Sequence, residues 1–199
     1  MRRSVIREPQ RLDRTDTDDI PDDVLIGDVA AGDRDAFRVL TQRYTRLFYA
    51  VAMRAGLDRT EAEDVAQDTL LRVWRSADTW RRDGGASVRT WLYRIAWNIC
   101  TDRLRQRKSP MVELPDDLAA TSDGADKIMH DDQRKKIVGA AVAMLPERQR
   151  AALILCHYEG LSHAEAGAVL GASAKAVEGL VGRARQELAT RLKKYRGVL

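Results

Sequence analysis

The sequence predicts an all-α protein in which two small helical domains are joined by a flexible linker. Apolar residues recur at helical spacing in two separate blocks, 21–108 and 130–199, and no segment shows the alternation of a half-buried strand. The segment 109–129 between them contains Pro110, Pro115, Gly124 and five acidic residues, a composition typical of linkers. Residues 1–20 lack periodicity and are predicted to form a mobile tail.

The N-terminal block is predicted to contain three long helices. The first covers Asp35–Ala55 and ends at Gly56. A capping box over Thr60–Glu63 is expected to open the second. A polar, glycine-containing loop, Arg81–Ser87, separates it from a third helix over Val88–Arg107, whose far end is basic.

The C-terminal block predicts a helix-turn-helix. Two helices are expected over 137–144 and 146–159. A short helix follows, opened by a capping box at Ser162–Glu165 and ended by Gly171. A long basic helix then runs from Ser173 to about Tyr195. A short helix, a tight turn and a long basic helix are the arrangement that places a recognition helix in the major groove of DNA.

The composition argues against membrane insertion, metal binding and catalysis. The chain has 199 residues, 44% hydrophobic and 32% charged, with a formal net charge of +4. No apolar run approaches the roughly 18 residues of a membrane span, and no secretory signal follows Arg2 and Arg3, so a cytoplasmic protein is expected. Cys100 and Cys156 form no motif with the histidines, so neither a metal nor a cofactor is predicted. No set of acids, bases or nucleophiles resembles an active site.

The start of the final helix supplies the candidate contacts to duplex DNA. Lys175 suits guanine and Glu178 suits cytosine N4, whereas Arg183 and Arg185 lie further along, where phosphates run. The alternative is the solvated face of an ordinary helical hairpin. The candidate residues are Ser173, Lys175, Ala176, Glu178, Gly179, Arg183 and Arg185.

Aromatic and arginine side chains gather around the third N-terminal helix, as in proteins that bind single-stranded DNA. Trp74 and Trp91 are expected in the core. For Tyr93 and Trp97, core packing and base stacking remain equally open. The loop Arg81–Ser87 is of a kind that accommodates an extruded base.

The helix over Glu61–Arg75 alternates acids with bases on its exposed face. Asp64 and Asp68, and likewise Asp68 and Arg72, lie four residues apart and so share a face. Taken alone, this pattern favours a solvated, charged surface.

Three blocks together resemble a known family. The segments AEDVAQDTLLRVWR, VRTWLYRIAWNICTDRLRQRK and LPERQRAALILCHYEGLSHAEAGAVLGASAKAVEGLVGRARQEL are similar to the conserved regions of extracytoplasmic-function (group IV) sigma factors of the sigma-70 family. The resemblance implies a subunit that directs RNA polymerase to promoters, with sigma region 2 over 21–108 and sigma region 4 over 130–199.

The resemblance also implies roles for particular residues. Region 4 would contact the −35 element through the recognition-helix residues given above and would sit on the polymerase β flap. The segment that docks on the β′ clamp helices matches Asp64, Gln67, Asp68, Leu71, Arg72, Trp74 and Arg75. The −10 element would be contacted by Arg81, Arg82, Asp83, Ser87, Arg89, Tyr93, Arg94, Trp97, Asn98 and Arg103.

Partners and alternatives follow from the same resemblance. RNA polymerase core, promoter DNA and an anti-sigma factor are the expected partners. Glu178 and Gly179 depart from the residues usual in the family, so the −35 sequence is left open. A helix-turn-helix repressor would explain 130–199 alone, and a helical enzyme would need a constellation of catalytic residues that the sequence lacks.

Overall fold

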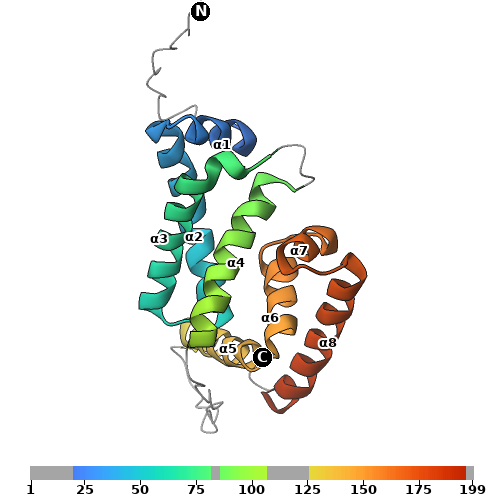
Figure 1. The fold of residues 1–199 in the computed structure, drawn as a ribbon. Helices are drawn as coiled ribbons and strands as arrows, with labels where there is room; N and C mark the ends of the chain where they lie inside the picture. The colour runs from blue at the N-terminus through green and yellow to red at the C-terminus, as the bar shows by residue number, and fades with distance from the viewer. Residues whose placement is uncertain (1–19, 82–85, 107–125, 196–199) are drawn as a thin grey trace, which may run out of the picture.

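The computed structural model describes residues 20–81, 86–106 and 126–195, and within these ranges every regular element is helical (Figure 1). The all-α prediction is confirmed. The predicted tail over 1–19, the loop positions 82–85 and most of the predicted linker lie outside the described residues. No helix in the described ranges is long and apolar enough to cross a membrane.

In the N-terminal domain, a short helix lies across the end of three longer helices that run side by side (Figure 1). The core of this domain contains the fully buried side chains of Leu25, Leu40, Phe48, Val73 and Leu92. The elements are α1 (Asp22–Ala30), α2 (Arg34–Ala55), α3 (Arg59–Ser76), η1 (Ala77–Thr79) and α4 (Val88–Gln106).

The boundary between α2 and α3 corrects one prediction. Gly56 ends α2 in the left-handed region (φ 100°), as expected. The capping box is formed by Asp58 and Glu61, however, and not by Thr60–Glu63. The Asp58 carboxylate accepts the Glu61 backbone N–H at 2.9 Å, and the Glu61 carboxylate accepts the Asp58 N–H at 3.1 Å. Asp58 is the last extended residue after the turn, so Thr60 already lies inside the helix.

The C-terminal domain has the predicted helix-turn-helix with two differences. One helix begins at Asp126, inside the segment predicted as linker. The helix predicted over 146–159 instead passes from an α-helical into a π-helical turn. The elements are α5 (Asp126–Ala143), α6 (Glu147–Leu153), η3 (Ile154–Tyr158), α7 (His163–Leu170), α8 (Ala174–Leu192) and η4 (Lys193–Tyr195).

The turn of the helix-turn-helix is shaped by caps and by a close approach of two backbones. The capping box at Ser162–Glu165 and the left-handed Gly171 (φ 61°) are confirmed. The backbone of the turn at Ala172 lies close to Gly167 of α7. A Cβ atom on Gly167 would stand 2.5 Å from the carbonyl oxygen of Ala172. Only glycine fits this position without moving the turn.

The two domains pack against each other along an apolar surface, the interdomain seam. It joins Tyr93, Trp97 and Cys100 of α4 to Leu155, Val169 and Val177 of the C-terminal domain, all of them buried in one cluster. Figure 1 shows α4 beside α6 and α7. Both the Tyr93 and the Trp97 ring are covered in this arrangement, and their stacking on −10 bases stays a prediction. Trp74 and Trp91 pack against the N-terminal core, as predicted.

Candidate nucleic-acid and polymerase interfaces

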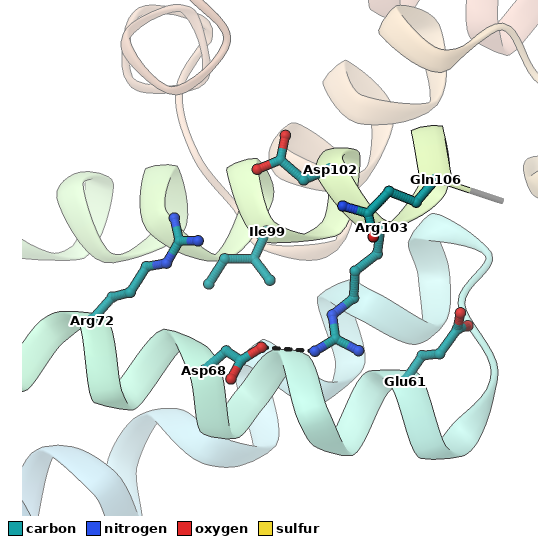
Figure 2. Close-up of a pocket in the computed structure, with 7 residues that line it drawn as sticks. All are labelled: Glu61, Asp68, Arg72, Ile99, Asp102, Arg103 and Gln106. Carbon is teal, nitrogen blue, oxygen red and sulfur yellow. Dashed lines mark hydrogen bonds and ion pairs between the residues drawn. The ribbon is translucent and has the colours of Figure 1, made fainter.

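A polar groove of about 550 Å³ lies between α3 and α4 (Figure 2). Arg103 of α4 reaches across it to two carboxylates of α3: its Nη1 lies 3.1 Å from Asp64 Oδ2 and its Nη2 lies 2.7 Å from Asp68 Oδ2. Arg72 and Asp102 also line the groove. The prediction that Asp64 and Asp68 share a face is therefore confirmed. Arg103, which pairs with both, lies too far along the sequence for the spacing to have indicated it.

Arg103 was predicted to contact −10 DNA, but here its guanidinium is held by α3. The hydrogen bond to Asp68 raises the pKa of Arg103 above its already high ordinary value, so this guanidinium stays charged. Arg103 thereby fixes the positions of two side chains in the predicted polymerase-docking segment.

The remaining predicted docking residues divide into exposed and inward-facing side chains. Leu71 is 50% exposed, and Gln67, Arg72 and Arg75 are also exposed. Trp74 instead turns inward and packs its ring 5.0 Å from that of Phe37. The outer face of α3 thus offers one apolar and several charged side chains to a partner.

A second cavity, of about 440 Å³, lies beside the start of α4. Trp80, Ser87 and Arg89 are among the residues that line it. The Trp80 indole N–H is buried and has no hydrogen-bond acceptor among the described residues. Ser87 Oγ accepts the Thr90 backbone N–H at 3.1 Å and so caps α4. Arg82 and Asp83, also predicted here, lie outside the described residues, whereas Arg81 is exposed.

The other predicted −10 residues of α4 occupy two environments. Arg94 and Asn98 are exposed. Tyr93 and Trp97 lie in the interdomain seam, where the Tyr93 hydroxyl donates a 2.7 Å hydrogen bond to Glu159 of the C-terminal domain. Burial, together with this bond, raises the pKa of Tyr93 to about 12. The α4 surface is therefore partly covered in this arrangement.

No sequence pattern indicated a role for Glu159 or Arg54. Arg54 of α2 forms a 2.7 Å ion pair with the Glu159 carboxylate, which is 2% exposed. These two residues stand 105 positions apart, and each occupies an ordinary place near a helix end, so no local pattern indicated the pair.

Most of the predicted −35 residues of α8 are exposed. Lys175, Ala176, Glu178, Arg183 and Arg185 are exposed, whereas the positions between them, such as Val177 and Val181, are buried. Ser173 Oγ accepts the Ala176 N–H at 3.2 Å, so this hydroxyl serves as the helix cap. A Cβ on Gly179 would lie 3.4 Å from the Arg183 guanidinium, so the glycine leaves room for that side chain.

Two family models match the chain in the order of its domains. Residues 40–109 match Sigma-70 region 2, and residues 135–188 match Sigma-70, region 4. The chain belongs to the extracytoplasmic-function sigma factors of the sigma-70 family. It is therefore a sigma factor that directs transcription to promoters, a class of initiation factors.

Similar proteins span most of this sigma factor. The ECF RNA polymerase sigma factor SigE of Mycolicibacterium smegmatis is 34% identical over 173 residues, which is 83% of this chain and 66% of SigE. The sigma factor NccH of Alcaligenes xylosoxydans is 34% identical over 86% of this chain and 95% of NccH.

Solved structures agree on the fold. CnrH in complex with the cytosolic domain of CnrY gives a TM-score of 0.68 at 29% identity, over 87% of this chain and 97% of CnrH. RpoE in complex with the anti-sigma factor NepR from Bartonella quintana gives 0.60 at 26% identity, over 79% of this chain and 96% of RpoE.

Proposed function

We propose that this sigma factor divides promoter recognition between its domains, with residues 21–108 docking on the polymerase and holding unpaired −10 bases, and residues 130–199 contacting the duplex −35 element. The observation that carries this proposal is the cavity beside α4. It has a volume of about 440 Å³, and its polar lining combines Trp80 and Arg89 with the acidic residues Asp22 and Asp23. A buried indole N–H without an acceptor among the described residues suits the polar edge of a flipped base.

The outer face of α3 is the proposed docking surface for the β′ clamp helices. Exposed Leu71 supplies an apolar contact, and Asp64 and Asp68, held in place by Arg103, supply charges of fixed geometry. An interface of this kind gains affinity from a desolvated apolar centre and specificity from the charges around it.

The N-terminal half of α8 is the proposed −35 contact, with region 4 seated on the β flap. Lys175 and Glu178 are exposed one turn apart, where base edges lie for a helix docked in the major groove. Arg183 and Arg185, further along α8, are placed for phosphates.

The remaining partners follow from this function. The protein acts in the cytoplasm, where polymerase and the chromosome are found, and polymerase supplies the chemistry of RNA synthesis. An anti-sigma factor is proposed as its inhibitor, because the solved structures of CnrH and RpoE are complexes, the latter with an anti-sigma factor.

The test is transcription in vitro with purified core polymerase on a pool of genomic promoters. Discrete new start sites that require the protein are expected. Asp68→Ala should weaken core binding, whereas Arg81→Ala should leave core binding intact and reduce open complexes. Binding of duplex DNA without core binding or new starts would instead identify a repressor.

A further inference from the structure

A buried acid links the two domains at the edge of the interdomain seam. Glu159 follows the π-helical turn η3, and only 4% of the residue is exposed. A buried carboxylate is costly unless charges and hydrogen bonds compensate it. All the partners of Glu159 described below come from the N-terminal domain, so compensation requires the closed arrangement of the domains.

The three partners form a compact cationic recess. Arg54 contributes an ion pair at 2.7 Å and Tyr93 a hydroxyl hydrogen bond at 2.7 Å, each to a different carboxylate oxygen of Glu159. Arg89 donates to the Glu159 backbone carbonyl oxygen. The guanidinium of Arg89 also lies over the Tyr93 ring, 5.5 Å from its centroid.

This recess has the chemistry of a phosphate site. The Arg54 guanidinium and the Tyr93 phenol bind the two carboxylate oxygens of Glu159, and the Arg89 guanidinium donates to the backbone carbonyl of the same residue. Guanidinium and hydroxyl groups are the donors that proteins use for phosphate. Arg54 keeps 37% of its side chain exposed, so the recess lies at the rim of the seam. Arg89 and Tyr93 belong to α4, the helix that also carries Arg94 and Asn98, two exposed residues predicted to contact the −10 element.

We infer that Arg54, Arg89 and Tyr93 form a binding site for a backbone phosphate of single-stranded promoter DNA, and that Glu159 fills this site in the closed form. The inference rests on the proposed function and adds Arg54 to the DNA-binding residues. The Glu159 carboxylate and the phosphate exclude each other, so DNA enters only when the C-terminal domain withdraws. The same withdrawal uncovers Trp97 and Cys100.

The main variant is Glu159→Gln, which keeps the shape and the acceptor for Tyr93 but removes the charge that pairs with Arg54. The probe is a fluorescein-labelled single-stranded oligothymidine, titrated by anisotropy at low salt without polymerase. Glu159→Gln should bind about tenfold more tightly, because a larger fraction of the protein is open. Glu187→Gln is the matched control: it removes the same charge from the same domain, where Glu187 pairs with Arg191.

The phosphate site itself is tested in the opened background. Arg54→Ala added to Glu159→Gln should weaken oligothymidine binding about fivefold and reduce the salt slope by about 0.7, the value for one phosphate contact. The double variant is required because Arg54→Ala in the wild-type background removes the phosphate donor and releases Glu159 together.

Opening is followed independently by the reactivity of the Cys100 thiol in a Cys156→Ser background. Cys100 is fully buried in the seam, and burial raises its pKa to about 12, so it should label slowly in the wild type and faster in Glu159→Gln. Should Glu159→Gln fold poorly, Glu159→Asp shortens the side chain by one methylene and weakens its contacts with Arg54 and Tyr93, while all three phosphate donors stay in place; about a twofold gain in affinity is expected.

The outcomes separate this inference from the proposed function. Unchanged DNA affinity and unchanged Cys100 labelling in Glu159→Gln would overturn the occlusion by Glu159. A gain in affinity that survives Arg54→Ala would overturn the phosphate site. Run-off transcription by the same preparations with core polymerase tests the sigma function separately, since new start sites there do not depend on the state of the free protein.

Discussion

Replacing Gly167 with alanine tests the close approach in the helix-turn-helix. The new Cβ would stand 2.5 Å from the Ala172 carbonyl oxygen, so the turn must move by at least the 0.5 Å that separates this from the 3.0 Å limit of real contacts. Forcing atoms into a packed site costs about 1–3 kcal/mol, whereas alanine in a helix gains about 0.5–1 kcal/mol over glycine. A net loss of about 1.25 kcal/mol is expected, or about 2.5–5 °C in the apparent Tm.

The measurement is thermal unfolding followed by far-UV circular dichroism, with Gly182→Ala as control. Gly182 lies within α8, and a Cβ atom added there would have no neighbouring atom within 4 Å, so alanine should stabilise the protein by about 0.5–1 kcal/mol. The two variants should therefore shift the Tm in opposite directions. A Gly167→Ala protein that melts at or above the wild-type temperature would refute the close approach.

Three further expectations concern caps, the docking surface and alkaline stability. Ser162→Ala removes the acceptor of the Glu165 N–H and should cost about 1 kcal/mol in urea unfolding; an unchanged midpoint would contradict the capping box. Arg103→Met frees the Asp64 and Asp68 carboxylates and should weaken core-polymerase binding about threefold in a pulldown titration. The control is Arg105→Met, which removes a charge from the same helix at a side chain that is 69% exposed, and it should leave core-polymerase binding unchanged. The pKa of Tyr93 is raised from 10.0 to about 12, so between these pH values the native state keeps a proton that the unfolded state loses. The contribution of Tyr93 to the free energy of unfolding is therefore complete below pH 10 and declines from there to about pH 12. In urea unfolding, the stability of Tyr93→Phe should fall less steeply over this pH range.

Most of the helical architecture could be predicted from local signals. Gly56, Gly171 and the Ser162–Glu165 box act within a few residues of their own position, and the structure confirms each. The α3 cap was misplaced by two residues, because Asp58 and Thr60 are both acceptable caps and only the backbone conformation after Gly56 distinguishes them. The π-helical turn before Glu159 had no signal in the apolar spacing.

The candidate sites were less predictable because their geometry joins distant segments. Exposure of Lys175 and Glu178 followed from the helical period, and the structure confirms it. That Arg103 belongs to the α3 carboxylates depends on how α3 and α4 cross. The Arg54–Glu159 pair requires the packing of one domain on the other, which no sequence period encodes.

The mixed character of the interdomain seam makes the protein responsive to temperature. Its apolar part, built by residues such as Trp97 and Val169, loses strength on cooling, since the hydrophobic effect weakens toward low temperature. The buried ion pair of Arg54 with Glu159 changes in the same direction, because the desolvation penalty of charged groups grows on cooling. Cooling should therefore favour separation of the domains, which would uncover the part of α4 that carries Tyr93 and Trp97.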